Sequence, residues 1–414
     1  MRNMYDRHIQ SAIFDALADT PVLLINGARQ TGKSTLCQRI VEQSTFDWRF
    51  VTMDDPATLS AAKNDPMGFL EDLGSHVIID EVQRAPELFL PIKKLVDQDR
   101  DNRRIILTGS ADVMMLPKVG DSLAGRVEIH KLWPLSQDEL HGEPSSFIKT
   151  LTDPDASFVA TVTHWPDIAA KMRIGGYPES LSRKAANRRR RWFDDYLTAI
   201  LQKDIRDLSN IEGLNDIPNI LKLLATRVGS TLNMAEISRL SGVKNTTLKR
   251  YITMLEHIFI IVPIPAWTRN AEGEFVKSPK IFLNDTGLLV NFTGREDDTF
   301  LAQRAHAGPY LENFVVMEIM KQLSWSEQSL KPYHFSMHRG AEVDLVLEDR
   351  LGGLYGIEIK SAASLQKNDF KGLKHLADIA GDKFQKGTVL YSGSECLSGF
   401  GEKLQAVPIN ALWQ

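Results

Sequence analysis

The run GARQTGKS at positions 27–34 holds the residues whose types and spacing most clearly point to chemistry. It fits the pattern G-x-x-x-x-G-K-[ST], in which two glycines let the backbone curl so that successive N–H groups point at a phosphate. An apolar stretch at 22–26 precedes the run, and residues 35–41 follow it with helical spacing. This order of strand, turn and helix is the context that a phosphate-binding loop requires.

The turn therefore predicts a nucleotide site that uses Mg²⁺. Lys33 would reach the β- and γ-phosphate oxygens and assist catalysis, and the Ser34 hydroxyl would bind the metal ion. The N-terminal end of the following helix would add positive partial charge. The residues expected to bind the nucleotide here are Gly27, Ala28, Arg29, Gln30, Thr31, Gly32, Lys33, Ser34 and Thr35.

A second chemical signal is an apolar run at 77–79 that ends in two carboxylates, Asp80 and Glu81. This is the form of a Walker B element. In such an element Asp80 would hold Mg²⁺ through water, and Glu81 would polarise the attacking water as a general base. An accidental acidic pair is the alternative, but the complete phosphate loop upstream favours the catalytic interpretation.

Polar residues also follow a third apolar run, at 104–107. In a parallel sheet around a phosphate loop this strand lies between the other two, so its end faces the nucleotide. Thr108 or Ser110 would then contact the γ-phosphate or the attacking water. A hydroxyl-rich turn without that role is the alternative for each residue.

Arg126 ends the run LAGR at 123–126, just before an expected strand at 127–129. At the edge of the domain it would reach the γ-phosphate of a neighbouring subunit as a catalytic arginine finger, which predicts a homo-oligomer. A local ion pair is the alternative.

Five segments carry a resemblance to a known family: DEVQRAPEL at 80–88, LTGS at 107–110, LAGR at 123–126, WPLS at 133–136 and GGYPE at 175–179. Together they resemble a family of prokaryotic AAA-type ATPases that join an AAA domain to a C-terminal domain of uncharacterised function. The resemblance extends over nearly the whole chain. It implies ATP binding and hydrolysis, with ATP and Mg²⁺ as cofactors.

A second constellation of charged residues lies near the C-terminus. Residues 339–347 are expected to form a turn that enters a strand, with Asp344 on that strand. Alternation along the next strand places Glu358 and Lys360 on one face. Asp344 and Glu358 would share a divalent metal ion, and Lys360 would orient or activate water. Glu312, on an expected helix upstream, would complete the metal shell. This predicts a second divalent metal.

This arrangement is that of the PD-(D/E)xK nuclease fold, which the C-terminal part of the family also resembles. It raises metal-dependent DNA cleavage as a hypothesis. The alternative is that the nuclease-like core is retained for binding only.

The middle of the chain predicts a winged helix-turn-helix. Helical patterns at 220–228, 233–240 and 244–257, with Gly242 at the turn, precede two apolar strands at 258–262 and 276–282. A DNA-binding interpretation places Lys244, Asn245, Thr247, Lys249 and Arg250 against a groove or phosphates. Protein docking or a structural role is the alternative.

Composition limits the remaining classes. The chain has 414 residues, 43% hydrophobic and 25% charged, which suggests about two to four domains of ordinary composition. Its net charge of −4 excludes a global basic field, so nucleic acid would bind through local patches. Two distant cysteines, Cys37 and Cys396, argue against a disulfide framework or zinc cluster. Without a long apolar run or leader-like N-terminus, we expect a cytoplasmic protein with no membrane partner.

The sequence thus predicts an α/β chain in four parts. These are an AAA-type P-loop ATPase domain with a parallel sheet at 1–140, a lid or helical linker at 141–212, a winged helix-turn-helix at 213–290 and an α/β restriction-endonuclease-like domain at 296–414. The predicted function is Mg²⁺-dependent ATP hydrolysis coupled to nucleic-acid binding, with DNA cleavage as the further hypothesis. The alternative is an ATP-dependent regulatory switch that binds protein partners and carries an inactive nuclease-like module.

Overall fold

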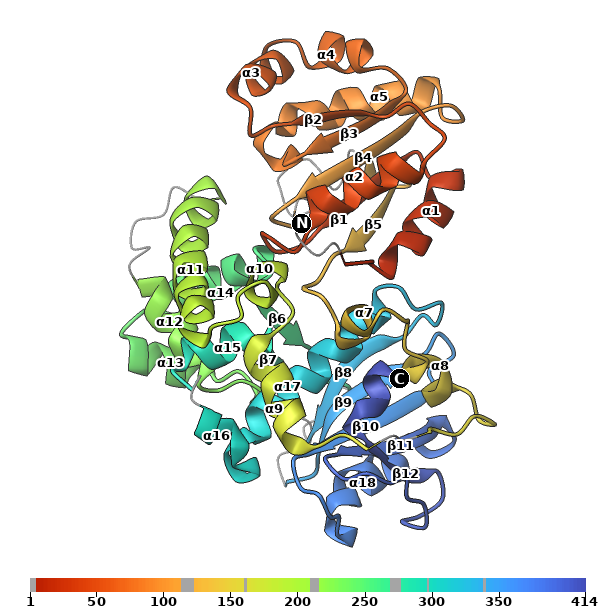
Figure 1. Cartoon of the computed structure of the whole chain (residues 1–414), viewed down its shortest axis with the longest axis vertical. Coiled ribbons are helices and arrows are strands. Elements are labelled where there is room, and N and C mark those ends of the chain that lie inside the picture. Colours follow the sequence, from red (N-terminus) through yellow and green to blue (C-terminus); the bar gives the residue numbers. More distant parts are fainter. Residues whose placement is uncertain are drawn as a thin grey trace. The chain divides into compact units, whose positions relative to one another are not determined.

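The computed structural model describes residues 5–112, 123–159, 162–208, 216–268, 277–295, 298–337 and 340–414. The chain divides into two compact units, drawn in Figure 1. The N-terminal unit comprises residues 6–134 and 257–260. The C-terminal unit comprises residues 135–256 and 261–414.

The N-terminal unit is built on a parallel sheet in the order β2-β3-β4-β1-β5. Its strands are β1 (Val22–Asn26), β2 (Arg49–Thr52), β3 (His76–Asp80), β4 (Arg104–Gly109) and β5 (Val127–Lys131). The strand β4 lies between β1 and β3, as the sequence predicts. Because all five strands run the same way, the residues that follow β1, β3 and β4 meet at one edge of the sheet. The predicted α/β fold with a P-loop parallel sheet is confirmed for this unit.

Helices cover this sheet, and some of them begin at side-chain caps. They are α1 (Ile9–Asp19), α2 (Lys33–Gln43), α3 (Pro56–Asn64), α4 (Pro66–Leu73) and α5 (Phe89–Gln98), with 3₁₀ turns η1 (Val82–Arg84) and η2 (Pro86–Leu88). Asp55 and Asp65 precede α3 and α4, and each carboxylate accepts a hydrogen bond from a backbone N–H of the first turn. A proline at the first helical position follows each cap, because that position needs no backbone donor.

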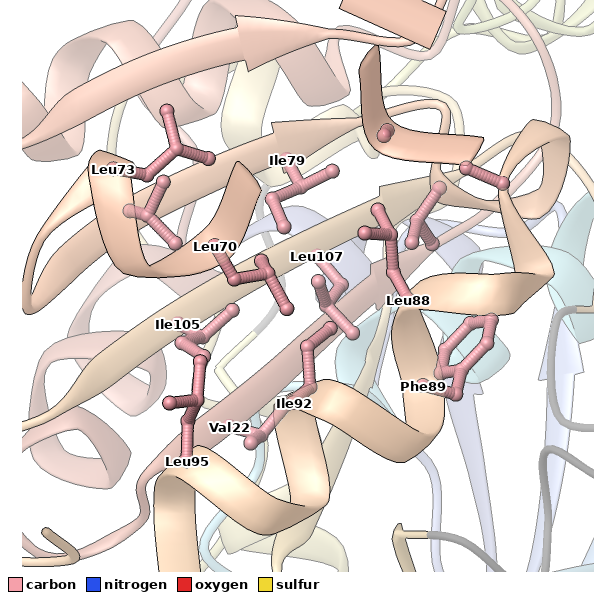
Figure 2. Packing of buried hydrophobic residues seen from close by; sticks show 14 of the residues in the cluster. Val22, Leu70, Leu73, Ile79, Leu88, Phe89, Ile92, Leu95, Ile105 and Leu107 are labelled. Atoms are coloured by element: carbon pink, nitrogen blue, oxygen red, sulfur yellow. The ribbon is translucent and has the colours of Figure 1, made fainter. Parts of the chain in front are cut away.

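The core of the N-terminal unit forms between α5 and the sheet (Figure 2). Ile92 and Leu95 on α5 pack with Val22, Ile105 and Leu107, which come from two neighbouring strands. Spacing of three residues along α5 places its apolar side chains on one face. The packing holds the strand ends in place and with them the predicted nucleotide site.

The C-terminal unit contains a second sheet, in the order β12-β11-β10-β9-β8. Its strands are β8 (Lys331–Ser336), β9 (Glu342–Glu348), β10 (Leu354–Lys360), β11 (Phe384–Tyr391) and β12 (Leu404–Pro408). The pairs β8–β9 and β9–β10 are antiparallel, whereas β10–β11 and β11–β12 are parallel. The helices α17 (Arg304–Leu323) and α18 (Lys371–Ala380) both contact β10. The predicted antiparallel partners that carry Asp344 and Glu358 are therefore β9 and β10.

The rest of the C-terminal unit is mostly helical. Its helices are α7 (Gln137–His141), α8 (Phe147–Thr152), α9 (Trp165–Ile174), α10 (Pro178–Leu181), α11 (Ala186–Leu208), α12 (Ile217–Ala225), α13 (Met234–Ser241), α14 (Asn245–His257), α15 (Thr286–Phe292) and α16 (Asp298–Ala302). The remaining elements are η5 (Lys367–Phe370), η6 (Gly381–Lys383), η7 (Ile409–Trp413) and the antiparallel pair β6 (Ile261–Ile264) and β7 (Lys280–Leu283). No helix of the described ranges is long and apolar enough to span a membrane.

The helices α13 and α14 are joined by a turn at Gly242, where the sequence predicts one. Gly242 ends α13 in the left-handed conformation with φ of 74°, and the buried Val243 follows it. The expected strand at 258–262 is only partly correct, because β6 begins at Ile261. The segment 269–274, between the two strands, lies outside the described residues.

The packing of α5 makes a stability prediction. Replacing Ile92 by Ala removes a fully buried side chain and should lower the free energy of unfolding of the N-terminal unit by about 2–5 kcal/mol. Leu90, on the same helix, is 63% exposed, so Leu90→Ala is the matched control and should change it by less than about 0.5 kcal/mol. Urea denaturation measures both. Equal losses in the two variants would contradict the packing described.

Candidate functional site

The phosphate loop between β1 and α2 has the backbone that its sequence predicts. Gly32 ends the loop with φ of 101°, and Gly27 begins it with φ of 153°. A Cβ atom on Gly27 would lie 2.2 Å from the carbonyl oxygen of Leu132, so no larger residue fits there. The backbone curl and the N-terminal end of α2 therefore meet at the carboxyl edge of the sheet.

Lys33 lies within this loop. Its ammonium donates hydrogen bonds to the carbonyl oxygens of Gly27, at 2.8 Å, and Ala28, at 2.9 Å. The side chain is 5% exposed. The amine is thus held against the loop, where a phosphate group would meet it.

Arg7 supports the loop from the N-terminal segment, and sequence reasoning missed it. Its guanidinium donates to the carbonyl oxygen of Thr31 at 2.8 Å and to that of Trp133 at 2.7 Å. Arg7 is buried, so these hydrogen bonds are formed away from bulk water. Arg7 belongs to no local sequence motif, because its partner Trp133 lies more than a hundred residues further along the chain.

Asp80, at the end of β3, accepts hydrogen bonds from hydroxyl groups on three other elements. Its carboxylate accepts hydrogen bonds from Ser34 at 3.1 Å, Thr108 at 2.5 Å and Thr52 at 3.4 Å. Hydroxyl and carboxylate oxygens are the ligands that Mg²⁺ prefers. The neighbouring Ser34 and Asp80 therefore fit a nucleotide-bound magnesium ion.

Glu81 follows Asp80 in the left-handed conformation, with φ of 56°. One of its carboxylate oxygens accepts hydrogen bonds from the Ser110 hydroxyl, at 3.0 Å, and from the Gln83 amide. The same Gln83 amide donates to Ser110 at 3.0 Å. The backbone N–H of Glu81 donates to Thr108 at 3.2 Å. Thr108 and Ser110 thus hold the two acids, and Gln83 is a partner that the sequence did not single out.

Arg126 lies at the opposite edge of the sheet from the phosphate loop. It immediately precedes β5, whose first residue pairs with the first residue of β1. Its guanidinium donates to both carboxylate oxygens of Asp97, at 2.5 and 2.9 Å. The hydrogen bond from Arg126 holds the pKa of Asp97 below its usual range. The structure supplies the local ion pair, and the arginine-finger role stays a prediction.

The second constellation comes together in the C-terminal unit as its spacing predicts. Asp344 on β9 accepts a hydrogen bond from the backbone N–H of Ile359 at 2.9 Å. Lys360 donates to Glu358 at 2.7 Å. The register pairs Ile357 with Leu345, and extending it by one residue sets Glu358 opposite Asp344.

Lys280 is the member of this cluster that sequence reasoning missed. Its ammonium lies 2.9 Å from a Glu312 oxygen, 2.6 Å from Glu342 and 3.1 Å from Asp344, and its side chain is 1% exposed. Within the described ranges, no three His, Cys, Asp or Glu side chains are placed to hold a metal ion. The metal shell of Glu312, Asp344 and Glu358 therefore stays a prediction, and a lysine ammonium stands among its carboxylates.

The environment of the cluster alters its ionisation. Burial, followed by the charge of Asp344, raises the pKa of both Glu312 and Glu358 to about 8. Burial lowers the pKa of Lys280, but the charges of Asp344, Glu312 and Glu342 outweigh it and raise that pKa well above its usual value. The second carboxylate oxygen of Glu358 is buried without a hydrogen-bond partner among the described groups.

The helix α14 presents its predicted polar residues to solvent. Lys244, Asn245, Lys249 and Arg250 are exposed, and Thr247 is half-buried. Leu248 and Tyr251 face the interior. Four of the five residues that the DNA-binding interpretation names are therefore exposed, on α14 or just before it.

Comparison with known proteins divides the chain into three matched segments. Residues 19–141 match an AAA domain, residues 166–299 match a domain of unknown function, DUF8612, and residues 307–412 match a domain of unknown function, DUF4143. Among solved structures, a Walker-type ATPase of Pyrococcus abyssi is 15% identical and covers 70% of this chain and 96% of that chain, with a TM-score of 0.44. The RuvB Holliday junction branch migration motor of Thermotoga maritima is 16% identical and covers 63% of this chain and 90% of that chain, with a TM-score of 0.31.

Two relatives with higher sequence identity match most of the chain. Uncharacterized proteins of Mycobacterium bovis and Mycobacterium tuberculosis are each 31% identical over 349 residues, which is 84% of this chain and 72% of theirs. An uncharacterized protein of Haemophilus influenzae is 23% identical over 255 residues, which is 60% of this chain and 58% of that protein. The chain belongs to the same protein family as the two mycobacterial proteins and carries an AAA-type P-loop ATPase domain.

Proposed function

We propose that the N-terminal unit binds ATP with Mg²⁺ at its phosphate loop and hydrolyses it. The observation that carries this proposal is that Lys33 and Ser34 meet Asp80 and Glu81 at one edge of a parallel sheet. A phosphate cradle, a pair of oxygen ligands and a carboxylate base are the parts that phosphoryl transfer to water needs.

Each residue has a role in this proposal. Lys33 exchanges its two carbonyl partners for phosphate oxygens when the nucleotide binds, and Arg7 keeps the loop in shape. Ser34 and Asp80 hold Mg²⁺, which when bound would neutralise charge on the phosphate oxygens. Glu81 accepts a proton from the attacking water.

Thr108 and Ser110 act as positioning residues in the same proposal. Thr108 binds the Asp80 carboxylate and the backbone of Glu81, so it fixes both acids relative to each other. Ser110 and Gln83 bind the carboxylate of Glu81. Glu81 must release at least one of these donors to bind water, which is a step that nucleotide binding would drive.

A second candidate function is nucleic-acid binding by α14. It is supported by the exposed Lys244, Asn245, Lys249 and Arg250, which follow a tight turn between two helices. Lysine and arginine on such a surface attract phosphate groups and release counterions. Metal-dependent DNA cleavage by the C-terminal unit stays a prediction, and the position of Lys280 among the carboxylates weighs against it.

The ATPase proposal is tested by two substitutions with different expected effects. Lys33→Ala should weaken ATP binding about tenfold or more, because a charge-assisted contact to phosphate is lost. Glu81→Gln should keep ATP binding but lower kcat by about 100-fold or more, because the base is lost. The exposed Glu87 provides a matched control, and Glu87→Gln should leave both unchanged. ATP binding without any turnover in the wild type would sink the hydrolysis proposal.

Binding of duplex DNA by α14 has its own signature. The double variant Lys249→Ala, Arg250→Ala should lower the slope of log affinity against log salt concentration by about two, one for each lost phosphate contact. Lys222→Ala, at an exposed position on α12, should leave the slope unchanged. Fluorescence anisotropy with labelled DNA measures it. An equal loss in both variants would indicate non-specific attraction alone.

The ion pair at Arg126 gives an expectation that separates it from an arginine finger. The Arg126 guanidinium is already paired with Asp97, and ion pairs near the surface contribute little energy. Arg126→Ala and Asp97→Ala should therefore both leave ATP turnover within about twofold of wild type. A collapse of kcat in Arg126→Ala alone, with turnover that rises with protein concentration, would instead support the finger and the predicted homo-oligomer.

A further inference from the structure

Lys280 is almost fully buried, yet it carries a charge that water would otherwise stabilise. A buried lysine is tolerated only when carboxylates compensate for its lost hydration. Three carboxylates do so here, from Glu312, Glu342 and Asp344, at 2.6 to 3.1 Å. The lysine and the acids therefore depend on one another.

The members of this cluster come from two different parts of the sequence. Lys280 begins β7, pairs with Ile264 on β6 and forms a bridge with Thr231. It belongs to the segment that matches DUF8612, whereas Glu312 on α17 and Asp344 on β9 belong to the segment that matches DUF4143. The ion cluster thus joins the two matched segments within the C-terminal unit.

The two matched segments are also packed closely together where Gly229 meets Glu312. Gly229 precedes the strand-like bridge at Thr231 and has φ of 75°. A Cβ atom there would lie 2.6 Å from a carboxylate oxygen of Glu312. Glu312 is therefore enclosed by the middle segment on one side and by the lysine ammonium on another.

The position of the ammonium decides which cation the cluster holds. A divalent ion would need oxygen ligands at about 2.0–2.6 Å, and it would use the same Glu312 and Asp344 oxygens that now contact Lys280. Two cations cannot share those oxygens at these distances without strong repulsion.

We propose that Lys280 takes the place of a divalent cation in this carboxylate cluster. The wild-type cluster then binds no metal ion and serves as a lysine-centred lock between the middle and C-terminal segments. Removal of Lys280 exposes a latent divalent-cation site, because the Glu312, Glu342 and Asp344 oxygens that now lie 2.6 to 3.1 Å from the ammonium can then close around a metal ion. This role of Lys280 does not depend on ATP hydrolysis by the N-terminal unit, so the two proposals are tested separately.

The first test uses the intact, nucleotide-free protein and Mn²⁺ as the probe. Isothermal titration calorimetry on the wild type should give the same Mn²⁺ binding as on Asp344→Asn, because the cluster is closed to metal ions. One Mn²⁺ bound by the wild type and lost in Asp344→Asn would overturn the proposal.

The second test replaces the lysine. Lys280→Met should lower Tm, because three acids lose their counter-charge, and Mn²⁺ should restore Tm by several degrees. Adding Asp344→Asn to this variant should abolish the response to Mn²⁺. A folded Lys280→Met variant whose Tm does not change when Mn²⁺ is added would also overturn the proposal.

The chain offers a matched control for lost buried charge. Lys321 is 4% exposed and lies 2.7 Å from Glu318, but it contacts no cluster of carboxylates in the described structure. Lys321→Met should lower Tm without any response to Mn²⁺. A similar rescue by Mn²⁺ in this variant would show a general effect of the ion and would count against a latent site. If Lys280→Met does not fold, the calorimetric comparison of wild type and Asp344→Asn still decides.

Discussion

The carboxylate of Asp80 is the point at which the separate segments of the N-terminal unit meet. It accepts hydrogen bonds from Ser34 on α2, Thr52 on β2 and Thr108 on β4. These groups come together only because four parallel strands end at one edge of the sheet. A shift of one residue in any pairing would turn these side chains to the other face. The strand register therefore fixes the geometry of the site, and the packing of α5 against the sheet maintains that register.

The carboxylates of Asp80 and Asp344 are both buried, but their charges are compensated differently. The three hydroxyl donors around Asp80 stabilise the acid but carry no formal charge. Around Asp344 the partner is the ammonium of Lys280. A divalent cation gains most where negative charge is not yet balanced. Asp80 therefore keeps an electrostatic reason to bind a cation together with a nucleotide, whereas at Asp344 the Lys280 ammonium already supplies part of the counter-charge.

The parts of the site that follow from local sequence could be predicted. The phosphate loop is one continuous turn, the acids at 80 and 81 end one strand, and alternation places Glu358 and Lys360 together on another. Arg7 and Lys280 could not be predicted in this way, because each binds partners that are distant in sequence. Arg7 reaches Trp133, and Lys280 reaches Asp344. Only the fold brings such groups together.

The metal prediction left out Lys280 for a physical reason of the same kind. Acids at metal-like spacing indicate a place of concentrated negative charge, but they do not say which cation balances it. A buried lysine needs these acids as much as a metal ion would, since removal of either partner leaves an uncompensated charge in the interior. The acids at 312 and 344 would thus be required for a stable fold even without metal chemistry. A nuclease-like pattern of carboxylates is therefore no evidence for cleavage until the nearest buried cation is known.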